Sequence, residues 1–301
     1  MKYVGILRQQ SANNAKTLLL LVLFPALLLG LCWVVCAFVE EDFTLWAPVV
    51  LGVTLIWFLI AYAFHSTMIS SATHSKPLER RENKRVYNLV ENLCMSQGLP
   101  MPRINVIDDP ALNAFASGIN RKSYTVTLTR GIMERLDDAE LEGVIAHELS
   151  HIRNRDVRLL IVSIVFVGIF TFIAQFAMRA LWYAPSGRSR NSKNDKGGAV
   201  VLLVIAVAAA IGYFFSLLLR FAISRKREYM ADAGSAEMTK NPRALAMALR
   251  KISGESKIIS VKREDVAQLF IEHPLSKKGG FSTLFATHPP IQRRIELLEQ
   301  F

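Results

Sequence analysis

The sequence predicts a mainly helical integral membrane protein, with four transmembrane helices and a cytoplasmic α+β part that contains a small β-sheet. Of the 301 residues, 51% are hydrophobic and only 20% are charged, and the mean hydropathy is +0.28. The apolar residues are concentrated in four uncharged windows, which leave two polar blocks. Soluble proteins carry about 25% charged residues, and disordered chains combine low hydrophobicity with high charge. The composition therefore excludes disorder and favours a membrane protein.

Each uncharged window is long enough to cross a bilayer as a helix. The windows cover residues 17–39, 43–64, 159–178 and 197–219, with lengths of 23, 22, 20 and 23 residues. About 20 apolar residues span the hydrocarbon core. The first window is too long for a signal-peptide core and lacks a small-residue cleavage site, so we expect it to be retained. The alternative, four buried helices of a soluble protein, is disfavoured in a chain of this length.

The charges that flank the first two windows predict the orientation of the chain. Residues 1–16 contain three basic side chains and no acidic one, residues 40–42 are all acidic, and residues 76–85 contain five basic and two acidic side chains. Basic flanks mark the cytoplasmic side and are attracted to anionic lipids. We therefore attribute the net charge of +11 mostly to membrane topology, and we expect a lipid bilayer as a partner. No basic and aromatic stripe of the nucleic-acid-binding type is present in the sequence, so no nucleic acid is expected.

The second pair of windows leaves its topology open. Residues 179–198 contain five basic side chains and one acidic side chain, which conflicts with a position outside the cytoplasm. Either both windows span the membrane, which we favour, or they form a hairpin that does not fully cross.

The sequence therefore divides into four segments. We expect an N-terminal transmembrane hairpin at residues 1–64, a cytoplasmic part at 65–158, a second transmembrane hairpin with a basic loop at 159–219, and a further cytoplasmic part at 220–301. β-Branched residues bounded by Pro, Asp and Gly predict short strands at 103–107 and 124–129. Residues 220–301 are predicted to be mainly helical, with an interruption near 277–280.

The clearest chemical signal is the H-E-x-x-H motif of His147, Glu148 and His151. Asp137 and Glu140 have the spacing of a capping box and predict a helix that begins just upstream. On a helix, histidines four residues apart project from the same side and can reach one zinc ion. Glu148 would then contact a zinc-bound water instead of the metal. A hydrogen-bonded polar helix surface is the alternative interpretation.

A second motif favours the metal interpretation. Glu228 and Asp232 are four residues apart on another predicted helix, and Glu228 supplies the carboxylate that a His₂Glu zinc site needs. Asp232 would accept the free N–H of a histidine ligand and fix its tautomer. The E-x-x-x-D pattern alone is equally typical of a solvated helix face. Together the two motifs predict one zinc ion per chain, with an even number of membrane crossings between them.

The order of these motifs resembles the HtpX-type membrane metalloproteases, in the peptidase family that includes the CAAX prenyl-protein endoproteases. The resemblance rests on residues 113–116, 146–151, 227–232 and 287–291, together with the chain length and the four apolar windows. It implies a zincin-like metalloprotease domain formed by the two cytoplasmic parts. His147, His151 and Glu228 would bind zinc, Glu148 would be the general base, and Asp232 would support a ligand.

The resemblance also implies a biological role. We expect a zinc endopeptidase of the bacterial cytoplasmic (inner) membrane, multi-pass, with its active site facing the cytoplasm. Its substrates would be misfolded or damaged membrane proteins or unfolded polypeptides, in protein quality control and the stress response. The natural substrates, the cleavage preference, the regulation and the oligomeric state are left open.

Several further residues are candidates for the site. His288 is expected near the zinc ion, as an additional ligand or an oxyanion stabiliser, and Arg294 either stabilises the transition state or forms a salt bridge. Asn113, Ala114 and Phe115 would belong to an edge strand that pairs with substrate, or else to an ordinary loop.

Two other functions remain as alternatives. A CAAX-type prenyl-protein protease is disfavoured because four spans are too few to enclose a large chamber. A non-catalytic zinc-binding membrane scaffold would bind zinc without any dependence on Glu148.

Overall fold

The computed structural model describes residues 6–182, 202–204, 206–214, 225–253, 255, 258, 269–271 and 289–301. The chain divides into two compact units. One unit collects residues 1–14, 65–161 and 220–301, and the other collects residues 15–64 and 162–219. Segments that are far apart in sequence therefore fold together in each unit.

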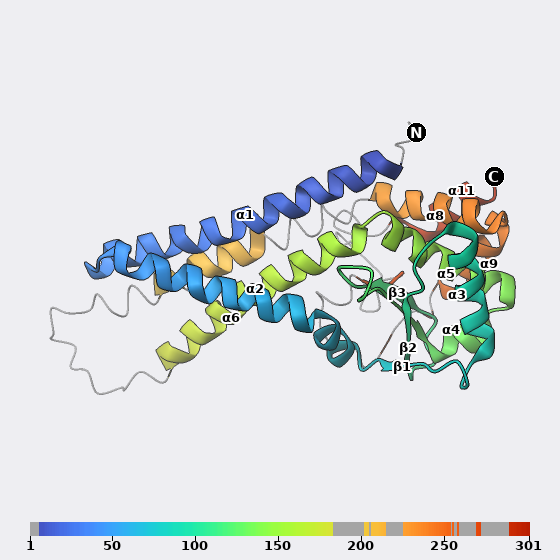
Figure 1. Ribbon diagram of the computed structural model, residues 1–301, viewed down its shortest axis with the longest axis horizontal. Helices are drawn as coiled ribbons and strands as arrows, with labels where there is room; N and C mark the ends of the chain where they lie inside the picture. Colours follow the sequence, from blue (N-terminus) through green and yellow to red (C-terminus); the bar gives the residue numbers. More distant parts are fainter. Residues whose placement is uncertain are drawn as a thin grey trace. The chain divides into compact units, whose positions relative to one another are not determined.

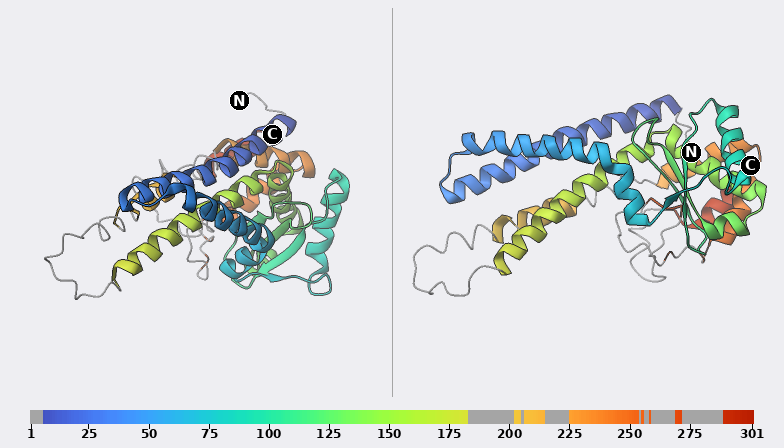
Figure 2. Two further views of the ribbon diagram at one scale, coloured as in Figure 1. Left: turned by 60° about the vertical axis from the view of Figure 1, so that its left-hand side comes forward. Right: turned by 60° about the horizontal axis from the view of Figure 1, so that its bottom comes forward.

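The second unit contains the greater part of the apolar helices, at residues 15–64 and 162–219. Helices α1 (Ile6–Val39) and α2 (Phe43–Thr73) lie side by side as an antiparallel hairpin (Figures 1 and 2). In the described part of the chain, two helices are long and apolar enough to cross a membrane, Gln10–Ala37 and Phe43–Thr73. Helix α6 (Asp156–Trp182) covers the third window, and a shorter helix at 202–214 covers part of the fourth. The crossing of the membrane by all four remains a prediction.

Aromatic side chains join three helices of this unit. Phe24 of α1 is fully buried, and its ring stacks on that of Phe166 of α6 at a centroid distance of 4.3 Å. Phe58 of α2 and Phe170 of α6 both approach Phe24 at 5.4 Å. Offset and edge-to-face ring pairs of this kind add to the packing energy. The helices of the two windows at 17–39 and 159–178 are therefore in direct contact.

A four-stranded mixed sheet lies in the first unit, in the order β1 (Lys76–Pro77), β2 (Arg103–Ile107), β4 (Thr125–Thr129), β3 (Ala114–Ser117). Strands β2 and β4 are parallel, and β3 pairs antiparallel to β4 with Ala114 opposite Leu128. The strands predicted at 103–107 and 124–129 are confirmed. Residues 114–117 form a strand at one edge of the sheet, as the edge-strand interpretation required.

Helix α5 (Asp138–Arg153) is the central element of this unit. It packs against α3 (Lys84–Gln97), α8 (Arg225–Thr239), α9 (Pro242–Ile252) and strand β3. The unit also contains α4 (Arg130–Arg135) and α11 (Ile291–Leu298), and α11 packs on α9 and α8. From Gly143 to Ile152 every side chain of α5 is buried, as expected for a helix surrounded by other elements. The helical prediction for residues 220–301 is confirmed in its described parts, while 277–280 lies outside them.

Glycines allow two helices to approach α5 closely. A Cβ atom at Gly234 of α8 would lie 2.4 Å from Ser150 Oγ, and one at Gly143 would lie 3.1 Å from the backbone nitrogen of Leu245 in α9. Real Cβ contacts are longer than the first of these distances. The absence of a side chain at Gly234 therefore sets how near α8 comes to the H-E-x-x-H helix.

A break separates α5 from α6, although the sequence leads directly from the motif into the third window. Helix α5 ends at Arg153, Arg155 has a φ of +60°, and α6 begins at Asp156. A positive φ is unusual for a residue other than glycine. The break lies at Arg155, four residues after the second histidine.

Candidate functional site

The capping box at the start of α5 sets the register of the motif helix. The side chain of Asp137 accepts a hydrogen bond from the backbone N–H of Glu140, and Glu140 accepts one from the backbone of Asp137. This arrangement satisfies two N–H groups at the helix start and is the one predicted from the spacing. Helix α5 then carries His147 and His151 on the same side, with exposed fractions of only 0% and 9%.

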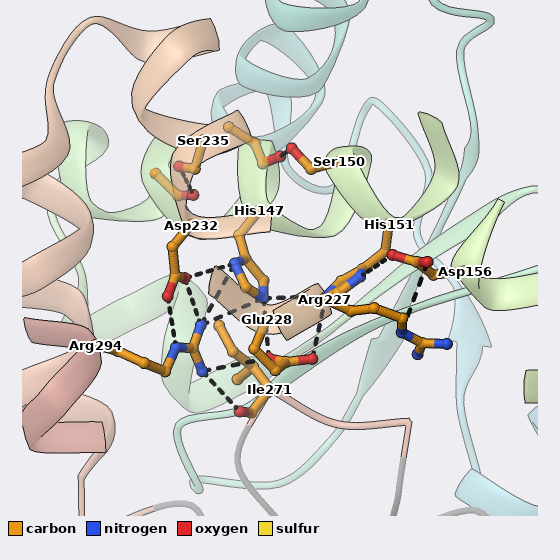
Figure 3. A network of polar contacts seen from close by, with 12 residues as sticks. His147, Ser150, His151, Asp156, Arg227, Glu228, Asp232, Ser235, Ile271 and Arg294 are labelled. Carbon is orange, nitrogen blue, oxygen red and sulfur yellow. Dashed lines mark hydrogen bonds and ion pairs between the residues drawn. The ribbon is translucent and has the colours of Figure 1, made fainter. Parts of the chain in front are cut away.

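The two histidines and Glu228 converge from two helices (Figure 3). The Nε2 atoms of His147 and His151 are 3.2 Å apart. The carboxylate of Glu228, on α8, lies 3.7 Å from Nε2 of His147 and 3.6 Å from Nε2 of His151. Among the described residues, these three are the group of His, Cys, Asp or Glu side chains able to hold a metal ion.

The spacing of these atoms fits a tetrahedral ion. With Zn–N and Zn–O bonds of about 2.0–2.1 Å, neighbouring ligand atoms in a tetrahedron are about 3.3 Å apart. The shortest distances between the three groups are 3.2, 3.6 and 3.7 Å, the last two to different oxygens of Glu228, and one ligand atom of each residue lies within 4.8 Å of the others. The donor set of two imidazoles and one carboxylate is also that of catalytic zinc sites. The three residues therefore form a donor set that could hold a metal ion, and a zinc ion fits that set.

Asp232 lies behind His147. Its Oδ1 atom is 3.0 Å from Nδ1 of His147, the ring nitrogen that faces away from His151. Burial by itself lowers the pKa of His147, but the hydrogen bonds to Asp232 and Glu228 raise the pKa to about 9. The carboxylates of Asp232 and Glu228 thus lie on the Nδ1 and Nε2 sides of the His147 ring.

Arg294, on α11, is completely enclosed, with an exposed fraction of 1%. Its Nε and Nη2 atoms donate to the two carboxylate oxygens of Asp232 at 2.9 and 2.7 Å. A third nitrogen, Nη1, lies 3.5 Å from Glu228. Burial opposes the charge of Arg294, but Asp232 raises its pKa above the ordinary value. The sequence left open whether Arg294 stabilises the transition state or forms a salt bridge. In the structure, Arg294 forms a salt bridge with Asp232.

Glu148 faces a pocket beside the histidines. The lining of this pocket includes Glu148, His151, Glu228, Ala116 of β3 and Phe270. Burial raises the pKa of Glu148 above its ordinary value, while the two histidines and the backbone N–H of Ala116 act in the opposite direction. A carboxylate with a raised pKa next to a metal-ligand group is typical of a general base.

Strand β3 forms the wall of this pocket, and its outer edge already has a partner. The backbone N–H of Ile271 donates to the carbonyl oxygen of Ala114 at 2.9 Å. The ring of Phe270 packs edge-on against Phe115 at 4.7 Å. Asn113 is buried just before the strand, where its backbone N–H donates to Thr129 Oγ1. The segment 269–271 thus lies along the strand proposed to bind substrate.

The structure also reveals a partner of His151 that the sequence did not indicate. Asp156, the first residue of α6, places Oδ2 3.1 Å from His151 Nδ1 and is itself buried. Arg227, next to Glu228, lies 3.6 Å from the other oxygen of this carboxylate. Burial alone would raise the pKa of Asp156, but Arg227 and His151 lower it below its ordinary value. Only the position of Asp156 after the motif, followed by an apolar window, could have drawn attention to it.

The site residues predicted from the sequence fall into three groups according to where the structure places them. The structure brings together His147, Glu148, His151, Glu228, Asp232 and Arg294. Asn113, Ala114 and Phe115 lie at the neighbouring edge strand. His288 lies outside the described residues.

Comparisons with known proteins identify the family of this chain. Residues 80–301 match Peptidase family M48. A protease HtpX homologue of Bacteroides fragilis is 59% identical over the full length of both chains. Another, of Dictyoglomus thermophilum, is 39% identical and aligns with 95% of this chain and 92% of its own. The crystal structure of S. mikatae Ste24p has a similar fold, with a TM-score of 0.50 at 19% identity over 97% of this chain and 67% of that one.

Proposed function

Because this chain belongs to peptidase family M48 and is a membrane metalloendopeptidase, we propose that His147, His151 and Glu228 hold one zinc ion and that Glu148 is the general base. The convergence of two imidazole nitrogens and one carboxylate within 3.2–3.7 Å of one another is the observation that carries this proposal. The relatives reported above are protease HtpX homologues, which agrees with the resemblance found in the sequence motifs. These relatives favour neither the prenyl-protein protease nor the non-catalytic scaffold.

The pocket beside the histidines gives each residue a task in peptide hydrolysis. A zinc ion bound here would polarise the substrate carbonyl and lower the pKa of a bound water to about 7. Glu148 accepts the proton of the attacking water and passes it to the leaving nitrogen. Its burial favours the first of these transfers, since a carboxylate with a raised pKa is a better proton acceptor.

Strand β3 offers the surface on which a substrate backbone would lie. Alternate residues of a strand direct their backbone groups to the same edge. Ala114 meets Ile271 at the outer edge, and the N–H of Ala116 meets Glu148. An extended peptide that pairs with β3 next to Glu148 would bring its carbonyl group to the metal ligands. Pairing at Ala114 would require residues 269–271 to leave that carbonyl.

His288 remains a proposal from the sequence alone, as an additional ligand or an oxyanion stabiliser. Asp232 is proposed to fix the tautomer of His147, a role that its Oδ1–Nδ1 distance of 3.0 Å supports.

The setting of this site is proposed to be the inner face of the bacterial cytoplasmic membrane. Four transmembrane helices, from windows 17–39, 43–64, 159–178 and 197–219, would return the chain twice to the cytoplasm. The collection of residues 65–161 and 220–301 in one compact unit supports an even number of crossings between them. Misfolded membrane proteins and unfolded polypeptides would be the substrates, in quality control under stress.

The test compares wild type with the variants Glu148→Gln, Glu142→Gln and Glu228→Ala, each as the full chain purified in detergent and loaded with zinc. Wild type is expected to cleave casein or itself. Glu148→Gln should retain one zinc ion per chain but lose at least 10²-fold in activity, because the proton acceptor is removed. Glu142→Gln, on the same helix and outside the pocket, is the matched control and should remain active.

Glu228→Ala tests the ligand set separately. It should lower the zinc content, since a His₂ site has lost its third ligand. Full zinc content in this variant would exclude Glu228 as a ligand. Zinc retained in wild type without any Glu148-dependent cleavage would favour the scaffold.

A further inference from the structure

Asp156 is a buried carboxylate that the proposed reaction does not use. Its Oδ2 atom lies 3.1 Å from His151 Nδ1, while Nε2 of the same ring faces His147 and Glu228 (Figure 3). Only 2% of the residue is exposed. The carboxylate therefore contacts a proposed metal ligand on the side of the ring that faces away from the metal site.

The helix break brings Asp156 to this position. In one continuous helix, a residue five places after His151 would be rotated by about 140° from it, since each residue adds about 100°. Arg155, with a φ of +60°, interrupts the helix, and α6 starts again at Asp156. A left-handed conformation is unfavourable at a residue other than glycine. The surrounding contacts must stabilise this conformation.

Helix α1 supplies several of those contacts. The side-chain amide of Asn13 donates to Asp156 Oδ1 at 2.6 Å and to the carbonyl oxygen of Asn154 at 3.0 Å. Gln10, one turn earlier, donates to the carbonyl oxygen of Arg153 at 2.7 Å. These carbonyl groups belong to the end of α5, where helical partners are missing. The first turns of α1 thus hold both the break and the carboxylate.

Arg227 holds the carboxylate from a third element. Its Nε atom lies 3.6 Å from Asp156 Oδ1, and it immediately precedes Glu228 on α8. Behind His147 an arginine likewise lies beside the carboxylate, but there Arg294 donates hydrogen bonds to Asp232, whereas Arg227 forms an ion pair with Asp156 without a hydrogen bond from Nε. Each histidine therefore has its own carboxylate on Nδ1, and each carboxylate has its own arginine.

We propose that Asp156 is a positioning residue, which accepts the Nδ1–H of His151 and leaves Nε2 free for the metal, and that Asn13 and Arg227 hold Asp156 in place. A carboxylate on the far nitrogen of a histidine ligand fixes its tautomer and orientation and makes it a better donor. This inference rests on the proposed ligand set. It makes the N-terminal end of α1 a part of the metal site.

The experiment measures metal binding by the full chain in detergent. Zinc affinity is determined by competition with a chromogenic chelator, and the visible absorption of the Co²⁺-loaded protein reports the ligand geometry. Asp156→Asn should lower zinc affinity by about 10- to 100-fold and change the Co²⁺ spectrum. Asn13→Ala keeps the carboxylate and should change both readouts in the same direction by a smaller amount.

The matched control is Glu140→Gln, at the other end of α5. Glu140 is as buried as Asp156, at 2% exposed, and accepts a hydrogen bond from Lys251 at 2.6 Å. Its loss should lower the thermal stability without changing zinc affinity or the Co²⁺ spectrum. A purely structural role of Asp156 would give this same pattern and would overturn the inference.

His151→Ala separates this inference from the proposed function. If His151→Ala loses zinc while Asp156→Asn and Asn13→Ala bind zinc like wild type, only the positioning role fails. If His151→Ala also binds like wild type, the proposed ligand set fails and the inference fails with it. If Asp156→Asn does not fold, an unchanged Asn13→Ala variant still overturns the proposal.

Discussion

Each histidine of the motif helix lies between two carboxylates. His147 contacts Glu228 through Nε2 and Asp232 through Nδ1, and His151 contacts Glu228 and Asp156 in the same way. Glu228 is shared, and the other two carboxylates are individual. Single residues therefore have distinct tasks, and their substitutions should have distinct effects.

Arg294 is the residue for which stability and catalysis can be distinguished. Arg294→Gln should lower the free energy of unfolding by about 3 kcal/mol, because it leaves the buried carboxylate of Asp232 without its cation. Arg293→Gln is the control on the same helix, since Arg293 is more than half exposed and pairs only with Glu296 among its described ion pairs. Its effect should be at most about 1 kcal/mol.

Thermal unfolding in detergent measures both variants. Equal stabilities of Arg294→Gln and Arg293→Gln would contradict a structural salt bridge. If such a stable Arg294→Gln variant had a reduced kcat, the transition-state role would be supported instead.

At the level of elements, the site depends on how closely α8 approaches α5. Glu228 and Asp232 lie on α8, and both histidines lie on α5. Gly234 contacts the same helix through Ser150. The distance between the two helices therefore sets the distance between the carboxylate and the imidazoles.

Gly234→Ala should move the two helices apart. The new methyl group would lie 2.4 Å from Ser150 Oγ and 3.0 Å from Ser150 Cβ. Overpacking of this kind costs about 1–3 kcal/mol. We expect a lower melting temperature together with weaker zinc binding, measured by thermal unfolding and chelator competition.

Gly52→Ala provides the control for this substitution. Gly52 lies in α2, and a Cβ atom there would have nothing within 4 Å. Alanine favours a helix over glycine by about 1 kcal/mol, so this variant should be as stable as wild type or more stable. Wild-type zinc affinity in Gly234→Ala would show that the approach of α8 does not control the site.

For the whole molecule, the site requires both polar blocks on one side of the membrane. Residues 65–161 and 220–301 fold as one unit, and the proposed ligands come from both. The positive flanks predict a cytoplasmic position for this unit. Only the second hairpin, with its basic loop, conflicts with that rule.

Cysteine labelling tests this topology. Single cysteines at Glu41, Arg81 and Ser192 are introduced into a chain whose three native cysteines are replaced by alanine. A membrane-impermeant thiol reagent should label positions 41 and 192 on intact cells, and position 81 only after permeabilisation. Labelling of position 192 only after permeabilisation would show that the second hairpin does not fully cross.

The sequence by itself determined several features that depend on local spacing. The capping box at Asp137, the two histidines four residues apart and the strand at 103–107 follow from periods that neighbouring residues set. The uncharged windows likewise required only composition and length. The same short motifs carried the family resemblance. The match of residues 80–301 to Peptidase family M48 confirmed it.

Only the tertiary structure decided which distant groups meet. Arg294 reaches Asp232 across 62 residues, and Asn13 reaches Asp156 across 143. No periodicity links such positions, because their contacts depend on how helices pack and on one backbone break at Arg155. Spacing within a helix is fixed by its own geometry, whereas partners between helices are fixed by the packing of the whole unit.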